Sequence, residues 1–454
     1  MELSAQWKVK TTLPNRYGLP RTECNVCYVM VTFSCELLPI GGVWMSQKNS
    51  VRAEDEFSRY MRVFPQADGW LGRSEEERDG LAYRHTLCEI LQQPDTWLKT
   101  ASQVLACANR LGALLDGCEQ VVLTGSGSSE YAGECVRVPL QKALRMPVQT
   151  IGSGALLTNG TALLPETTAL MVSFARSGDS PESVAALQVA QRLNANVRHL
   201  IITCNKQGRL STSFRKGDDL EAIVLDPRTN DRSLVMTSSF TNMALAALGL
   251  SYLKAPQQFV RHAEQLSETG TNILRTAFER FPEFLQERFE RAFYLASPSL
   301  FGAARESALK MTEMTAGRVI TVCETYLGLR HGPMSAVHPD SLVACFLSAD
   351  PLVRAYELDV VRELNQKQLG MKKLFIGSDI PSDIARPGDL TIDVAGFDDD
   401  DFTSILYVVA GQVLALLRCL QEGLRPDAPS KDGVISRVVG EFRIYGMEET
   451  AAVL

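Results

Sequence analysis

The sequence predicts an α/β protein of two similar units in tandem, preceded by a helical arm. From residue 121, short β-rich runs alternate with helix-length patterns, which is typical of a parallel sheet covered by helices on both faces. The alternation starts again near residue 292, after a long helical stretch. The first predicted strand of each set leads into a loop of small residues: Thr124-Gly-Ser-Gly-Ser-Ser129 and Ala296-Ser-Pro-Ser-Leu-Phe-Gly302.

Length and composition agree with a soluble protein of more than one domain. The 454 residues exceed one ordinary core, and the chain is 45% hydrophobic and 22% charged. The net charge of −7 and the lack of a basic tract argue against nucleic acid as a partner. The apolar stretch 26–38 is too short and too polar for a membrane span, so no membrane partner is expected.

The cysteines are typical of a cytoplasmic protein. Eleven are scattered along the chain, an odd number, and most lie in apolar patterns, so we expect reduced, buried thiols. Cys24-x-x-Cys27 has no matching pair downstream, and the chain has only 5 His. We therefore expect no zinc or other metal site.

Residues 1–44 do not fit the rest of the chain. Basic residues precede an interrupted apolar stretch, as in a weak signal peptide, but no A-x-A cleavage site follows. We expect Met45 to be the natural start and 1–44 to be a non-native or disordered extension. Apolar residues at helical spacing predict an N-terminal helical arm over 45–118, which Gly117 ends.

The two units follow in order. Unit one, 119–255, has predicted strands at 121–123, 148–151, 169–173, 199–203 and 221–225, and helices at 132–144, 181–193 and near 208–215. Helical patterns at 238–253 and 256–290 close that unit and form the connection. Unit two, 291–435, has predicted strands at 292–295, 319–322, 342–346, 373–376 and 390–394, and a helix near 401–422. Residues 436–454 form a C-terminal tail.

The first small-residue loop is a candidate anion site. A strand, a Gly/Ser loop and a helix in succession place N–H groups and hydroxyls at a helix N-terminus. The third glycine of G-x-G-x-x-G is missing, so a phosphate monoester such as a sugar phosphate fits better than a dinucleotide. An ordinary turn with capping serines explains this stretch equally well when it is taken alone. The candidate residues are Ser126, Gly127, Ser128 and Ser129.

A second such loop lies in Ser173-Phe-Ala-Arg-Ser-Gly-Asp-Ser-Pro-Glu-Ser183. It follows a predicted strand and precedes a helix that has Pro in its first turn. The carboxyl ends of parallel strands share one edge of a sheet, so Arg176, Ser177 and Ser180 are expected to converge with the first loop. Ser180 by itself is also explained as a helix N-cap.

Two further patterns carry acid/base groups. Glu306, Lys310 and Glu313 lie on one helix face at i, i+4 and i+7, a spacing that alone favours an exposed ion-pair stripe. His331 lies between Arg and Gly-Pro, which makes it an acid/base candidate, although it also fits a turn cap. His338 is the less favoured histidine.

These motifs together resemble the sugar isomerase (SIS) superfamily. The forms around Arg176 and His331, with Met236-Thr-Ser-Ser-Phe-Thr241 between the units, resemble its AgaS-type galactosamine-6-phosphate deaminase/isomerases. The match runs from about residue 60 to the C-terminus and is similar in layout to the isomerase half of glucosamine-6-phosphate synthase. The resemblance implies two flavodoxin-like SIS domains, a homodimer that shares its active sites, and no cofactor.

The resemblance also implies roles for single residues. Glu313 would move a proton between C1 and C2 of the sugar, and His331, from the partner subunit, would open the ring. Arg176 stands where the synthase has a glutamine, which makes it a candidate phosphate contact. The residues that would hold the phosphate are Ser126, Ser128, Ser129, Ser177 and Ser180. Further candidates for the site are Glu324, Arg330, Thr237 and Lys431.

The expected activity is conversion of galactosamine-6-phosphate to tagatose-6-phosphate and ammonia. The chain lacks the glutaminase domain that supplies ammonia to the synthase, which favours the ammonia-releasing direction. One alternative is an aldose–ketose isomerase acting on a nitrogen-free hexose phosphate such as tagatose-6-phosphate. The other is a regulator that binds a sugar phosphate, against which Glu313 and His331 together argue.

Overall fold

A computed structural model describes residues 56–214, 219–430, 433–441 and 443–445. The expectation for 1–44 and the candidate Lys431 lie outside these residues. The described residues all fall within one compact unit, so its two sheets and their helices are placed relative to each other.

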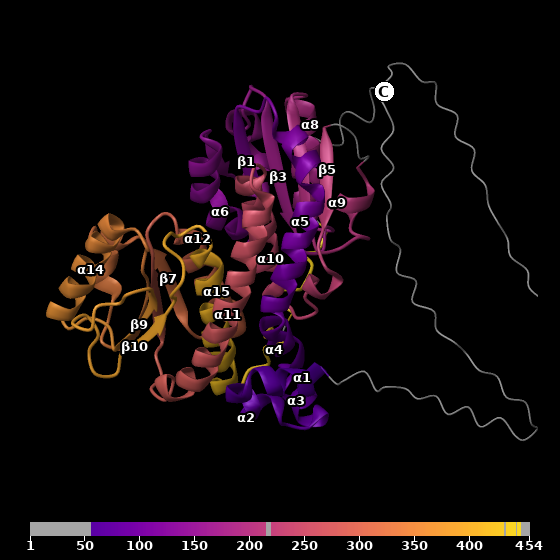
Figure 1. The fold of residues 1–454 in the computed structure, drawn as a ribbon. Helices are drawn as coiled ribbons and strands as arrows, with labels where there is room; N and C mark the ends of the chain where they lie inside the picture. The colour runs from indigo at the N-terminus through magenta and orange to yellow at the C-terminus, as the bar shows by residue number, and fades with distance from the viewer. Residues whose placement is uncertain (1–55, 215–218, 431–432, 442, 446–454) are drawn as a thin grey trace, which may run out of the picture. The chain divides into compact units, whose positions relative to one another are not determined.

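Two five-stranded parallel sheets form the framework (Figure 1). The strand order is β2-β1-β3-β4-β5 in the first sheet and β7-β6-β8-β9-β10 in the second, so both sheets have the same doubly wound topology. The prediction of two similar α/β units in tandem is confirmed. The strands are β1 (Gln120–Thr124), β2 (Val148–Thr150), β3 (Ala169–Ala175), β4 (Val197–Thr203), β5 (Leu220–Val224), β6 (Arg291–Leu295), β7 (Ile320–Glu324), β8 (Ser341–Phe346), β9 (Lys372–Gly377) and β10 (Leu390–Asp393).

The predicted helical arm is a series of short helices that leads into one long helix. Ser74 and Glu77 form a reciprocal capping box that starts the third of them. The arm ends at Gly117, whose φ of 72° suits glycine. The helices are α1 (Glu56–Val63), η1 (Pro65–Ala67), α2 (Asp68–Leu71), α3 (Glu75–Leu81), α4 (Arg84–Leu91) and α5 (Gln93–Leu115).

The helices of the first unit and the connection include one that the sequence patterns miss. This helix, α7, contains two glycines and two threonines, which weaken its apolar periodicity. Helix α6 also starts four residues earlier than predicted, at Ser128. The helices are α6 (Ser128–Leu144), α7 (Ser153–Leu163), α8 (Pro181–Leu193), α9 (Arg209–Thr212), η2 (Pro227–Thr229), α10 (Ser238–Leu248), η3 (Gly249–Tyr252) and α11 (Pro256–Phe284).

The second unit also contains a helix that is missing from the predicted elements. This helix, α14, has clear start signals, because Asp350 accepts hydrogen bonds from two backbone N–H groups of the first turn and Pro351 follows. The helices are α12 (Phe301–Met314), α13 (Tyr326–Leu329), η4 (Pro333–Ala336), α14 (Pro351–Gln366) and α15 (Thr403–Gln421).

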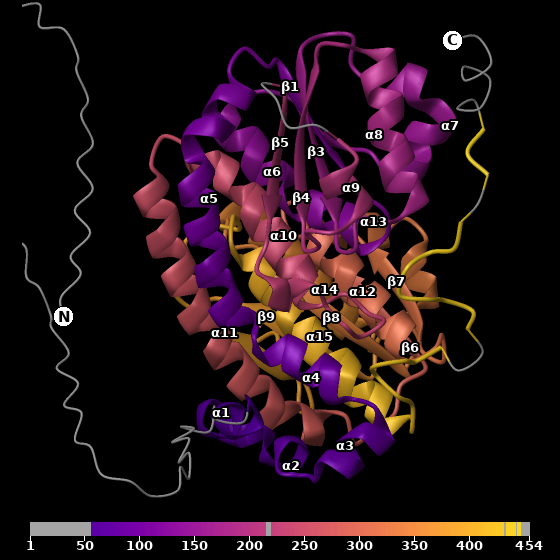
Figure 2. The ribbon, with the colours of Figure 1, turned by 90° about the vertical axis from the view of Figure 1, so that its right-hand side faces the viewer.

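The largest hydrophobic core lies between the two sheets. It joins one face of each sheet to the helices between them, and the other faces pack against their own helices in smaller cores. Helix α11 runs beside α5 and α15, and α12 packs on α6 (Figure 2). Among the described helices, α15 alone is long and apolar enough to cross a membrane, and 94% of that stretch is buried inside the protein.

The contact between α6 and α12 leaves no room for a side chain at Gly302. A Cβ there would overlap the backbone nitrogen of Cys135. We expect Gly302→Ala to lower the free energy of unfolding by about 2–3 kcal/mol, since the backbones must separate. Gly112, within α5, has no atom within 4 Å of an added Cβ. Gly112→Ala should therefore raise that free energy by about 0.5–1 kcal/mol. Urea unfolding of both variants is the measurement, and equal effects would contradict the close packing.

Candidate active site

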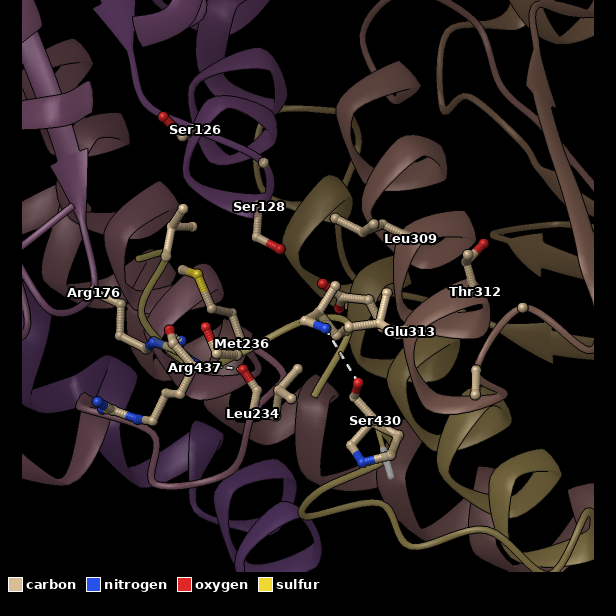
Figure 3. Close-up of a pocket in the computed structure, with 18 of the residues that line it drawn as sticks. Ser126, Ser128, Arg176, Leu234, Met236, Leu309, Thr312, Glu313, Ser430 and Arg437 are labelled. Carbon is tan, nitrogen blue, oxygen red and sulfur yellow. Dashed lines mark hydrogen bonds between the residues drawn. The ribbon is translucent and has the colours of Figure 1, made fainter. Parts of the chain in front are cut away.

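A cavity of about 920 Å³ opens between the first unit, helix α12 and the C-terminal segment (Figure 3). Its walls come from four parts of the chain: the loop after β1, Arg176 with the stretch 234–236, the C-terminal half of α12 with the turn after it, and described residues between 424 and 440. The lining residues are Ser126, Gly127, Ser128, Arg176, Leu234, Met236, Leu309, Thr312, Glu313, Ala316, Gly317, Arg318, Leu424, Pro429, Ser430, Val434, Ile435, Ser436, Arg437, Val439 and Gly440.

The loop after β1 brings hydroxyls and a helix N-terminus to this cavity. Gly125 allows the close turn, because a Cβ at this position would lie 2.5 Å from the backbone of Ser129. The Oγ of Ser126 is buried and has no hydrogen-bond partner in the protein. Ser128 is the first residue of α6 and lines the cavity, so an anion here would meet a positive helix end.

Helix α12 places a buried lysine between two carboxylates. The Nζ of Lys310 lies 3.2 Å from Oε1 of Glu306, donates a hydrogen bond to Glu313, and donates another to Ser128 Oγ at 3.1 Å. The side chains of Glu306 and Lys310 are 0% exposed, whereas that of Glu313 is 21% exposed and lines the cavity. The exposed ion-pair stripe that the spacing alone favours is therefore wrong, because this face of α12 packs on α6.

Burial sets the ionisation of this group. It raises the pKa of Glu306 to about 7, although the nearby Lys310 ammonium acts in the opposite direction. Burial alone would lower the pKa of Lys310, but its two carboxylate neighbours outweigh that effect and raise it. The ion pair with the Lys310 ammonium thus fixes the position of the Glu313 carboxylate in the cavity wall.

Arg176 lies in the cavity wall beside Arg437, on the side opposite Glu313 (Figure 3). It is buried, and its guanidinium donates hydrogen bonds to the backbone carbonyls of Ser233 and Leu234, at 3.3 and 2.9 Å, and of Arg437. Burial lowers the pKa of Arg176. The observed partners of this predicted phosphate contact are thus carbonyls.

The other predicted phosphate residues lie close in sequence to the lining residues but do not line the cavity. Ser129 is buried in the first turn of α6. Ser177 Oγ accepts a hydrogen bond from the backbone N–H of Asp179 at 3.2 Å. Ser180 is the N-cap residue of α8, and its Oγ donates to Glu182 at 2.7 Å.

The predicted acid/base histidine is away from its own chain's cavity. His331 is exposed in the segment between α13 and η4, and the neighbouring Arg330 pairs with Glu363 on α14 at 2.8 Å. Glu324 accepts a hydrogen bond from the backbone of Thr325 at 2.7 Å. Thr237 is fully buried and its Oγ1 has no partner, but it does not line the cavity.

The corresponding edge of the second sheet is already filled by two carboxylates of the chain itself. Glu357 accepts from Ser297 Oγ at 2.6 Å and from Ser348 N–H at 2.8 Å. Asp400 accepts from the Oγ groups of Ser299 and Ser348, at 2.5 and 2.6 Å. The hydroxyls after β6 and β8 are therefore satisfied internally, unlike Ser126 after β1.

The buried carboxyl group of Glu357 predicts that the stability of the protein depends on pH. Burial raises the pKa of Glu357 from 4.5 to about 7, so its contribution to stability is complete at low pH and is lost as the pH rises through 7. Between pH 5 and pH 8, the unfolding free energy of the unaltered protein should therefore fall by on the order of 2–3 kcal/mol relative to that of Glu357→Gln, which has no carboxyl group to ionise at this position. Urea unfolding at the two pH values measures it, and parallel changes in both proteins would contradict it.

The described cysteines are free, six of them buried, as the sequence predicts, and Cys24, Cys27 and Cys35 lie outside the described residues. No group of three or more His, Cys, Asp or Glu side chains within the described ranges is arranged to hold a metal ion.

The alignment of this chain with each of two relatives spans nearly the whole length of that relative. No protein-family model matches it. The AgaS protein of Streptomyces coelicolor is 36% identical over 373 residues, which are 80% of this chain and 96% of the relative. The chain belongs to the AgaS group of the SIS phosphosugar isomerase family. Another AgaS protein, the D-galactosamine-6-phosphate deaminase of Escherichia coli O157:H7, is 32% identical over 359 residues, or 77% and 93% of the two chains.

A solved structure of this family has the same fold. The tagatose-6-phosphate ketose/aldose isomerase from Escherichia coli superposes with a TM-score of 0.71 at 31% identity and covers 78% of this chain and 96% of that chain. The two five-stranded sheets are therefore two SIS domains, as the resemblance implied.

The sequence patterns miss much of the cavity wall of this AgaS member. The missed residues that bear charged or polar groups are Thr312, Arg318, Ser430, Ser436 and Arg437. For Thr312, the signal is its position one residue before Glu313 on α12. The C-terminal residues follow the last helix without any hydrophobic period, so no sequence pattern placed them at the site.

Proposed function

We propose that this chain converts galactosamine-6-phosphate and water to tagatose-6-phosphate and ammonia. The observation that carries the proposal is the position of Glu313, a carboxylate fixed by Lys310 in the wall of a cavity that is also lined by Ser126 and by the N-terminus of α6. The names of its AgaS relative and of its structural neighbour support the same sugar-phosphate chemistry.

The phosphate anchors the substrate at the first loop, and this binding energy orients C1 and C2. Once the ring is open, Glu313 takes the C2 proton, which gives an enol-type intermediate, and returns a proton to C1. The product is an imine at C2 that adds water and breaks down to the C2 ketone and ammonia. The proton transfer thus uses one carboxylate first as a base and then as an acid, and the whole conversion is formally a hydrolysis.

Ring opening falls to His331 of the partner subunit in a homodimer with shared sites. Its exposure on its own chain, next to α13 with the exposed Leu327, supports this arrangement. We also propose a cytoplasmic location, which the free cysteines support.

Deuterium transfer tests the proton-transfer step. In D₂O, tagatose-6-phosphate formed from galactosamine-6-phosphate should carry solvent deuterium at C1, read by mass spectrometry. The nitrogen-free isomerase would instead interconvert tagatose-6-phosphate with its aldose and leave the amino sugar unchanged. A regulator would bind the sugar phosphate and exchange no carbon-bound proton.

A further inference from the structure

The C-terminal segment 433–441 forms part of the cavity wall but buries little of itself. Val434 is 85% exposed and Val439 is 55% exposed. Its local hydrogen bonds join Ile435 N–H to Ser430 and Ser436 Oγ to Val438. Hydrophobic burial therefore contributes little to holding this segment at the site.

Arg437 joins this segment to the first unit. Its Nε donates to the carbonyl of Asp231 at 2.7 Å, and an Nη donates to the side-chain oxygen of Asn230 at 2.7 Å. In the other direction, the guanidinium of Arg176 donates to the carbonyl of Arg437. An Nη of Arg437 also lies 3.4 Å from the carbonyl oxygen of Asn230. Among the described residues of 433–441, these are the hydrogen bonds that reach beyond the adjacent Ser430.

The loop 230–234, to which both arginines bind, is itself held in place by hydrogen bonds with buried parts of the chain. Glu89 on α4 accepts from the backbone of Arg232 and from both the N–H and the Oγ of Ser233. Asp231 accepts from the N–H groups of Thr237 and Ser239, at 2.8 and 2.9 Å, at the start of α10. The segment is thus attached to a rigid, buried part of the chain.

We infer that Arg176 and Arg437 are positioning residues that clasp the C-terminal segment against loop 230–234 and so complete the sugar-phosphate cavity. The buried guanidinium of Arg176 donates to three carbonyls on two segments and so holds these segments together. Arg176 directly follows β3 in the predicted phosphate loop, so the clasp links that loop to the C-terminal wall. The choice of substrate in the kinetic test rests on the proposed function, but the clasp does not.

The first test needs no substrate. Hydrogen–deuterium exchange of the full chain is compared for the unaltered protein, Arg437→Ala, Asn230→Ala and Arg425→Ala. Arg425 is exposed, precedes the segment and makes no described side-chain hydrogen bond, so it is the matched control. We expect faster exchange in 433–441 and in loop 230–234 for the first two variants only. Unchanged exchange in Arg437→Ala would overturn the clasp.

The second test separates positioning from direct phosphate binding. Asn230 does not line the cavity, and its described side-chain hydrogen bond comes from Arg437, so Asn230→Ala should act on the site through Arg437. We expect KM for galactosamine-6-phosphate to rise about tenfold in Arg437→Ala and several-fold in Asn230→Ala, with kcat changed less. A KM that rises in Arg437→Ala but not in Asn230→Ala would overturn positioning in favour of direct contact. If the unaltered protein leaves this sugar unchanged, the proposed function fails, while the exchange result still decides on the clasp.

Discussion

Glu313→Gln is expected to abolish turnover of galactosamine-6-phosphate while the protein still binds it. The amide can accept the hydrogen bond from Lys310, so the local structure is retained, but it cannot take the C2 proton. Loss of a positioned general base typically costs about 10²–10⁴-fold, and in the proposed mechanism the same group acts twice, so a fall in kcat of at least about 10³-fold is expected.

The measurement pairs steady-state kinetics with calorimetric binding of the sugar phosphate. Glu279→Gln is the matched control, because Glu279 is exposed on α11 and remote from the lining residues, and it should behave as the unaltered protein. Turnover that persists in Glu313→Gln would remove Glu313 from the mechanism. Loss of binding together with turnover would make it a binding group instead.

His331→Ala should lower kcat by about 10²–10³-fold, although His331 is exposed and does not line the cavity of its own chain. The expectation depends on the proposed dimer, in which the partner's histidine would complete each site. The dependence can be tested directly, because Glu313→Gln and His331→Ala damage different halves of one shared site.

Co-expression of the two variants should restore activity. A mixed dimer has one site with both defects and one site with neither, so random pairing gives about one quarter of the unaltered activity. Each variant expressed alone is the control. No recovery in verified mixed dimers would contradict sharing of the site across the subunits.

Much of the fold is readable from the sequence because the strands are short, β-rich and buried. The first run, Val121 to Leu123, lies in a strand that extends one residue further at each end. Helix α7 is not readable, because its glycines and threonines blur the apolar period. Helix α14, by contrast, carries clear capping signals at its start, so the sequence does mark it.

The site is only partly readable for a different reason. Parallel topology explains why the loop after β1 and Arg176 after β3 meet at one edge. Spacing cannot reveal that the face with Lys310 packs on α6, since burial depends on the partner helix. Nor can it place Arg437, whose contacts are with backbone carbonyls that carry no sequence signature.

The proposed deaminase activity is tested most directly by measuring ammonia and tagatose-6-phosphate together, from galactosamine-6-phosphate and from glucosamine-6-phosphate side by side. We expect equal amounts of both products from the galacto sugar, and none from it with Glu313→Gln. Absence of ammonia from either sugar would contradict the proposed activity. Interconversion of tagatose-6-phosphate would then indicate a nitrogen-free isomerase, and no conversion at all would indicate a protein that only binds sugar phosphates.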